Sequence, residues 1–312
     1  MKSSTAIATT DTDNRTAVGY VGRFAPTPSG NLHLGSLYTA TASYLDARAH
    51  HGRWLLRIED LDRPREVAGA ADEIQRTLEA FGFEWDGEAV RQRDRGSFYS
   101  RALASLNDRK LTFQCACSRL QLEDDSPYPG TCRARIAPAG VATATRLRVE
   151  PAIIQYGDRI QGIFRQDVAG AVGDVILRRR DQIAAYLLAV VVDDAAQGVT
   201  HIVRGADLLD NTPRQIYLQR ALGLPQPSYA HVPVITEPDG AKLAKSRRTV
   251  GLAPGTAMPQ LLTVFSMLGL EPPASLGGGG LTDAWRWALA NWNIQQVPRR
   301  LHFGVTDWKA YK

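Results

Sequence analysis

The chain has 312 residues, 44% of them apolar, so it can bury a large core and is too long for a minimal binding module. Its net charge of +5 suits contact with phosphate but is equally common in ordinary enzymes. The longest apolar run, residues 183–192, is far shorter than the roughly 20 residues that span a bilayer. We therefore expect a monomer of the cytoplasm with no membrane span, and a disordered tail over residues 1–17.

Apolar extended segments alternate with helical patterns through the first third of the chain. We predict strands at 18–25 and 53–59, a helix that starts at Leu34 and stops before Gly52, and further helices at 69–81 and 94–108. This alternation is typical of a parallel sheet with crossover helices.

A cysteine-containing insertion at residues 111–150 interrupts the alternation. The second half resumes with apolar segments at 174–178 and 183–192, a strand at 201–204, a helix at 212–222 and a strand at 229–236. Residues 251–312 then predict a small helical appendage. Its helices, at 258–268 and 281–292, flank Pro272, Pro273 and four glycines, which suggest a flexible joint.

The loop Pro26–Asn31 follows the first strand and leads into a helix. Its prolines and Gly30 force a turn, after which His33 stands at the helix start. Free amides at a helix start favour a phosphate, His33 can donate a hydrogen bond to it, and Gly35 lets a flat base approach. A capped helix with a surface histidine is the alternative for this loop taken alone.

A basic segment, Lys242-Leu-Ala-Lys245-Ser246, lies more than 200 residues later after a Pro-Asp-Gly turn. Two lysines three positions apart can neutralise the charge that develops on leaving pyrophosphate. By itself the segment is also compatible with a solvated basic loop.

The order and separation of these two motifs resemble the HIGH and KMSKS sequences of class I aminoacyl-tRNA synthetases. Residues 56–62, LRIEDLD, and 201–209, HIVRGADLL, are similar to the glutamyl branch of that class. The resemblance implies a Rossmann-type doubly wound parallel sheet, a catalytic domain over residues 18–250, and Mg²⁺ bound with ATP. It implies catalytic roles for His33 and Lys245, and ATP contacts from Ser29, Gly30, His33, Gly35, Ser36, Lys242, Lys245 and Ser246.

Two motifs depart from the family pattern. His33-Leu-Gly-Ser36 lacks the final residue of HIGH, and residues 242–246 lack the methionine and first serine of KMSKS. The groups expected to hold phosphate are retained, so only the rate or the affinity for ATP is expected to differ.

Glutamate carries two carboxylates and one ammonium, so its pocket needs cationic forks and an anion. The resemblance implies that Glu59 holds the ammonium and leaves undecided which arginine grips which carboxylate. The alternative is a set of ordinary surface ion pairs. The implied glutamate-binding residues are Arg23, Phe24, Ala25, Pro26, Thr27, Glu59, Tyr186 and Arg204.

All three cysteines, Cys115, Cys117 and Cys132, fall in one short window, which suggests a metal in a cytosolic chain. A tetrahedral zinc site needs a fourth ligand, and the resemblance implies that Tyr128 provides it. Such a site is structural, since no position is open for water. Three reduced structural thiols are the alternative.

Only about 60 residues follow the lysine segment, too few for the anticodon-binding half of a glutamyl-tRNA synthetase. Together with the cysteine segment and residues 186–194, this length makes the chain resemble the glutamyl-queuosine tRNA(Asp) synthetases. These truncated paralogues attach glutamate to the queuosine base in the anticodon loop of tRNA(Asp). The expected activity is ATP-dependent, tRNA-independent formation of glutamyl-adenylate followed by that transfer. A truncated enzyme that charges a tRNA 3′ end and a non-catalytic adenylate- or tRNA-binding protein are the alternatives.

Overall fold

The structure is a computed structural model that describes residues 19–118, 121–122, 127–236, 252 and 254–304. The predicted tail and the candidate residues Lys242, Lys245 and Ser246 lie outside these ranges. Within them, no helix is both long enough and apolar enough to cross a membrane.

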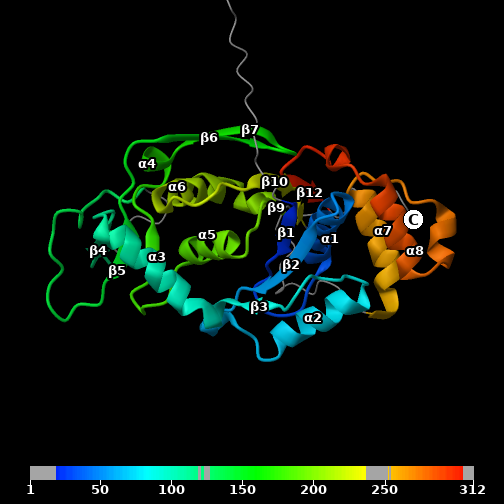
Figure 1. Ribbon diagram of the computed structural model, residues 1–312, viewed down its shortest axis with the longest axis horizontal. Helices are drawn as coiled ribbons and strands as arrows, with labels where there is room; N and C mark the ends of the chain where they lie inside the picture. The colour runs from blue at the N-terminus through cyan, green and yellow to red at the C-terminus, as the bar shows by residue number, and fades with distance from the viewer. Residues whose placement is uncertain (1–18, 119–120, 123–126, 237–251, 253, 305–312) are drawn as a thin grey trace, which may run out of the picture.

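A parallel sheet forms the centre of the molecule (Figure 1). β1 is adjacent to β9, because the N–H of Thr200 donates to the carbonyl of Val21 at 2.9 Å. The resulting order β3-β2-β1-β9-β10-β6 confirms the predicted parallel α/β fold. The strands are β1 (Val21–Phe24), β2 (Arg53–Ile58), β3 (Val90–Arg91), β6 (Ile153–Asp158), β9 (His201–Gly205) and β10 (Ser228–Val232).

Helices cover both faces of this sheet because its strands are apolar on both sides. Leu56 of β2 packs into one hydrophobic core and its neighbour Leu55 into the other. The first core includes α1 (Leu34–Ala49), α2 (Ala70–Ala80), α7 (Ala257–Met267) and α8 (Leu281–Asn291). The second core includes α3 (Gly96–Asp108), α5 (Tyr186–Ala196) and α6 (Thr212–Leu222).

The two central strands belong to different halves of the chain. α1 follows β1 and packs on one face, whereas α6 follows β9 and packs on the other. The connections therefore diverge at the carboxyl ends of β1 and β9, which is the position where doubly wound folds leave room for a ligand.

The insertion forms its own antiparallel sheet of β4 (Thr112–Cys115), β5 (Ala144–Leu147) and β8 (Ile176–Arg178). The segment 174–178, which we expected to resume the main fold, thus pairs with the insertion through β8. Between β5 and β8 the chain makes the hairpin β6–β7 (β7, Gly162–Asp167) and the short helix α4 (Val168–Ala171).

The carboxyl-terminal helices pack on the face of the parallel sheet that α1 covers. α7 and α8 contact α1, and β12 (His302–Gly304) pairs in parallel with β11 (Val234–Thr236). Where we expected a flexible joint, Ala274–Gly278 form a 3₁₀ helix and Leu276 packs against the core. The other 3₁₀ turns are Arg63–Arg65, Gln92–Arg95, Ala206–Asn211, Pro254–Thr256 and Ile294–Gln296.

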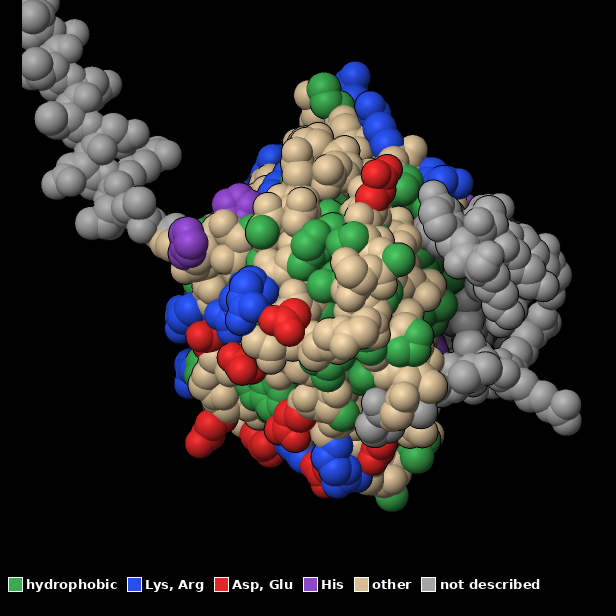
Figure 2. Space-filling view, turned by 90° about the vertical axis from the view of Figure 1, so that its right-hand side faces the viewer, with side chains coloured by type: hydrophobic (Ala, Val, Ile, Leu, Met, Phe, Trp, Pro, Cys, Tyr) green, Lys and Arg blue, Asp and Glu red, His purple; other side chains and the backbone are tan. Residues whose placement is uncertain are grey.

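Two basic side chains of the carboxyl-terminal part interact with neighbouring residues. Arg286 pairs with Asp283 at 2.8 Å, and Arg300 lies over the Phe303 ring. Figure 2, which views the α7–α8 end, shows acidic and basic side chains interspersed with apolar ones. This face carries no single-sign surface among the residues described.

Candidate active site

A cavity of about 270 Å³ lies at the carboxyl ends of β1 and β9. It is bordered by the loop after β1, the start of α1, the end of β9 and β11. The loop around Gly30 has the strained backbone that requires glycine, with φ of 124°. Seven candidate residues line the cavity: Phe24, Pro26, Thr27, Ser29, His33, Gly35 and Ser36. Ala25 and Gly30 belong to the same loop but are not part of the lining.

His33 is the N-cap of α1. Its Nδ1 accepts a hydrogen bond from the Ser36 N–H at 3.3 Å, which places the proton of a neutral ring on Nε2. A side chain at position 35 would press on this ring, since an added Cβ would approach His33 Cε1 to 3.1 Å. The two interpretations of His33, as a helix cap and as a ligand of phosphate, are therefore compatible. The same ring caps the helix and lines the cavity.

The described residues that flank the lysine segment lie close to the same cavity. Ile235 of β11 lies against Gly35. On the other side of the segment, the Leu252 N–H donates to the Leu32 carbonyl at 3.5 Å. Both flanks of residues 237–251 thus lie beside the His33 loop, although the lysines themselves lie outside the described residues.

A buried charge cluster lies at the ends of β1 and β2. Arg23 Nε contacts Asp194 at 3.3 Å, and Arg57 bridges Asp194 at 2.8 Å and Glu59 at 3.5 Å. Asp194 has a lowered pKa because Arg57 and Arg23 outweigh the effect of its burial. Burial raises the pKa of Glu59 to about 7, although the same arginines oppose the shift. A carboxylate so poorly solvated gains strongly from a substrate cation.

Arg204 is held by a buried network at the end of β9. Its Nε donates to His231 Nε2 at 3.0 Å, and its Nη2 donates to Thr212 Oγ1 at 2.7 Å. His231 in turn donates from Nδ1 to Asp158 at 2.6 Å. The remaining nitrogen, Nη1 of Arg204, is buried and has no hydrogen-bond partner among the described residues. An unpaired buried guanidinium nitrogen is costly unless a ligand supplies an anion, so Arg204 is ready to hold a carboxylate.

Tyr186 begins α5 and lies near these charges. Desolvation is the main reason why its pKa is raised to about 12, Glu59 raises it further, and Arg204 and Arg23 lower it. The residue is nevertheless 40% exposed, and it lines a second cavity of about 770 Å³. Arg23, Glu59 and Arg204 thus all lie close enough to Tyr186 to shift its pKa.

Four residues of this site were missing from our sequence analysis: Arg57, Asp158, Asp194 and His231. Only two of them carried a sequence signal. Arg57 interrupts an otherwise apolar strand, and Asp194 ends the apolar run at 183–192. His231 and Asp158 occupy different strands, so only the pairing of β6 with β10 reveals their contact.

The three cysteines of the insertion lie close together. Their sulfurs are all within 4.8 Å of one another, and Cys117 and Cys132 are 3.5 Å apart. The hydroxyl of Tyr128 lies 3.5 Å from the Cys115 sulfur and 3.9 Å from that of Cys117. Zinc–sulfur bonds of about 2.3 Å in a tetrahedron separate the sulfurs by roughly 3.7 Å. These residues therefore fit a metal ion.

A parallel sheet with a cavity at its switch point is typical of doubly wound nucleotide-binding folds, the class to which the catalytic domains of class I tRNA synthetases belong. The family of class I tRNA synthetases (E and Q), catalytic domain, matches residues 20–128 and 138–253. Over 281 residues the chain is 56% identical to the glutamyl-Q tRNA(Asp) synthetase of Ectopseudomonas mendocina (strain ymp), covering 90% of this chain and 95% of that protein. The protein of that name from Pseudomonas fluorescens is 53% identical over 287 residues, covering 92% and 96%.

The chain therefore belongs to the glutamyl-Q tRNA(Asp) synthetases, a family of ligase enzymes. Its fold is similar to that of a glutamate tRNA ligase from Elizabethkingia meningosepticum, solved in complex with its amino acid, with a TM-score of 0.75 and 23% identity. The similarity covers 90% of this chain and 66% of that one. The glutamate-tRNA synthetase of Elizabethkingia anophelis gives a TM-score of 0.77 over 93% and 69%.

Proposed function

We propose that the enzyme activates glutamate with Mg-ATP to glutamyl-adenylate in the absence of tRNA, and then transfers glutamate to the queuosine base in the anticodon loop of tRNA(Asp). The observation that carries the first step is the buried Nη1 of Arg204, which has no hydrogen-bond partner among the described residues and belongs to β9, whose last residue, Gly205, lines the cavity at the start of α1. The names of the relatives support the second step.

In the first step the protein positions two anions and neutralises their charge. Arg204 holds one substrate carboxylate, and Glu59 pairs with the substrate ammonium. The α-carboxylate of glutamate attacks the α-phosphate of ATP, and pyrophosphate leaves with its Mg²⁺.

His33 is positioned to serve ATP. Because its Nδ1 accepts from the Ser36 N–H, a neutral ring carries its proton on Nε2, and the start of α1 favours phosphate. Lys242 and Lys245 neutralise the charge on the leaving pyrophosphate, and the Ser246 hydroxyl donates a hydrogen bond to it. The described flanks of their segment, beside Leu32 and Gly35, support that role.

We assign a structural zinc ion to Cys115, Cys117, Cys132 and Tyr128. The Tyr128 oxygen accepts the Cys132 N–H at 2.9 Å, which directs it toward the sulfurs. When bound, the ion fixes the end of β4 against the turn that carries Cys132.

Charging of a tRNA 3′ end is the competing function. The chain matches the glutamyl-Q relatives over 95–96% of their length but the two solved glutamate enzymes over only 66% and 69% of theirs. This difference favours the anticodon-loop acceptor.

The test separates the two steps. We expect glutamate-dependent ATP–pyrophosphate exchange without tRNA, and about 10²–10³ slower exchange for Lys245→Ala. Absence of exchange would favour a non-catalytic binding protein, and a Lys245→Ala rate within about twofold of wild type would remove the role of that lysine.

To identify the position that accepts glutamate, transfer is measured to tRNA(Asp) whose terminal nucleoside is 2′,3′-dideoxyadenosine. Its 3′ end offers no hydroxyl, so glutamate can be attached only elsewhere. We expect transfer to this tRNA when it carries queuosine and none when it carries guanosine. Transfer only to tRNA with an intact 3′ end would establish ordinary charging instead.

A further inference from the structure

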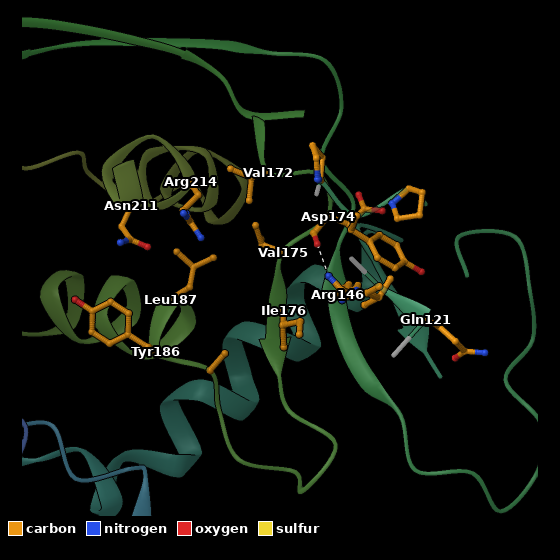
Figure 3. A pocket seen from close by; sticks show the side chains of 15 residues that line it. Gln121, Arg146, Val172, Asp174, Val175, Ile176, Tyr186, Leu187, Asn211 and Arg214 are labelled. Atoms are coloured by element: carbon orange, nitrogen blue, oxygen red, sulfur yellow. Dashed lines mark hydrogen bonds between the residues drawn. The ribbon is translucent and has the colours of Figure 1, made fainter. Parts of the chain in front are cut away.

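A second and larger cavity, of about 770 Å³, lies between α5, the start of α6 and the insertion (Figure 3). Its size is within the roughly 300–1,000 Å³ of ordinary small-molecule sites. Of the described residues that we assigned to ATP or glutamate, Tyr186 alone lines this cavity.

This cavity borders the glutamate site at two points. Tyr186 belongs to its wall and also lies near Glu59 and Arg204. At the start of α6, Thr212 holds Arg204, whereas the neighbouring Asn211 and Arg214 face the cavity. A molecule that occupies the cavity therefore lies next to the carboxylate that Arg204 would hold.

The wall of the cavity combines apolar surface with unsatisfied donors. Val175, Ile176 and Leu187 supply the apolar part, and Tyr186 supplies an exposed ring. The Nε atoms of Arg146 and Arg214 are buried and have no hydrogen-bond partner in the part of the chain that the structure describes.

The net charge of this wall is positive. The one carboxylate in the lining, Asp174, is neutralised by Arg133, which binds it through two contacts of 2.6 and 2.7 Å. Arg146 also donates from Nη1 to the Asp174 carbonyl and lies over the Tyr128 ring, so the donors left for a ligand are the Nε atoms of Arg146 and Arg214.

We propose that this cavity receives the acceptor nucleoside of the RNA, the one whose hydroxyl takes glutamate from the adenylate. The base lies on the apolar wall and the Tyr186 ring, and the arginines contact its edge or the flanking phosphate. In the transfer the acceptor oxygen forms the ester bond, the carboxyl–phosphate bond of the adenylate breaks, AMP leaves, and the hydroxyl proton goes to solvent or to AMP. The inference rests on the proposed function and adds where the second substrate binds.

The experiment measures exchange and transfer on the same variants. Ile176→Trp fills the cavity from β8, and Arg214→Gln removes one charge while keeping a polar side chain. We expect both to keep glutamate-dependent ATP–pyrophosphate exchange within about twofold of wild type and to lower transfer to tRNA at least tenfold at limiting RNA. Ile163→Trp, which changes an exposed residue of β7 outside both cavities, is the matched control and should leave both activities unchanged.

Two RNA probes distinguish the possible nucleosides. One is an anticodon stem-loop that carries queuosine, and the other is a hairpin that ends in the CCA sequence. The defect should appear with whichever probe the wild-type enzyme uses. Normal transfer by both variants, or equal loss of exchange and transfer in both, would overturn the inference. Absence of exchange in the wild-type enzyme would instead refute the proposed function.

Discussion

The hydrogen bonds around Arg204 determine which of its nitrogens is available to substrate. His231 is fully buried, and burial together with Arg204 lowers its pKa, so the ring stays neutral. Its Nδ1 proton is committed to Asp158, which leaves Nε2 as the acceptor for Arg204. His231 is therefore a positioning residue that acts through the guanidinium.

The variant His231→Asn tests this arrangement. The asparagine amide can still donate to Asp158 but has no acceptor at the Nε2 position, so Arg204 loses one of its anchors. We expect KM for glutamate to rise about tenfold or more, because a hydrogen bond to a charged group contributes about 1.5–3 kcal/mol. His231→Gln returns an acceptor near that position and should recover part of the affinity. An unchanged KM for glutamate in folded His231→Asn would contradict the role, and KM for ATP is the internal control.

The raised pKa of Glu59 predicts that the binding of glutamate depends on pH. Because burial raises its pKa to about 7, the carboxyl is increasingly protonated below pH 7 and loses its attraction for the substrate ammonium. KM for glutamate should therefore rise as pH falls from 8 to 5.5, by up to about tenfold per pH unit below 7. Glu59→Gln should show a high KM that does not vary with pH. The prediction fails if the wild-type KM is flat across this range.

At the scale of elements, the start of α6 contacts Arg204 and also lines the larger cavity. Thr212 faces Arg204 on one side, and Arg214, two residues later, faces the larger cavity on the other. The insertion contributes the opposite wall of that cavity through Tyr128, whose ring lies under Arg146 at 3.9 Å. The candidate metal site is thus part of the same wall as the proposed nucleoside site.

Zinc content can be measured on protein purified without added metal. We expect about one zinc per chain, and a value near zero for Cys132→Ser because three ligands hold the ion far less tightly than four. Thr131→Ser, a change at the exposed neighbouring position, should keep the metal. A wild-type protein that folds normally with no zinc would support three reduced thiols instead.

At the scale of the whole molecule, α8 is joined to the catalytic sheet through one aromatic cluster. Trp285 packs against Tyr44 and Phe83 with ring centroids 4.9 Å apart in each case, and its indole N–H donates to the Phe81 carbonyl at 2.9 Å. The division at residue 251 remains a prediction, but these contacts place the appendage helices in the same hydrophobic core as α1.

Removal of this ring should weaken the entire molecule. For Trp285→Ala we expect a loss of about 3–5 kcal/mol in the free energy of unfolding, since the side chain is 6% exposed and its cavity cannot collapse freely. Arg286→Ala, which breaks only an exposed ion pair, should change the same quantity by less than about 1 kcal/mol. Circular dichroism and the ATP–pyrophosphate exchange activity should be lost together on heating. Separate transitions would show that the appendage unfolds independently.

The sequence alone predicted the parallel α/β fold, because apolar strands, turn residues and helical patterns are local features. β1, β2 and α1 fall within a few residues of their predicted bounds. The loop after β1 was also predictable, since Pro26, Pro28 and Gly30 restrict the backbone wherever they occur.

The tertiary structure decided everything that depends on distant strands. The pairing of β8 with the insertion, the packing of α8 on α1, and the network from Asp158 through His231 to Arg204 join residues 27 to more than 200 positions apart. No local pattern encodes such contacts, because each residue is compatible with a core or surface role until its neighbours are known. The sequence determined that anion-handling groups are present, and the fold decided that one buried nitrogen of Arg204 is left without a partner among the described residues.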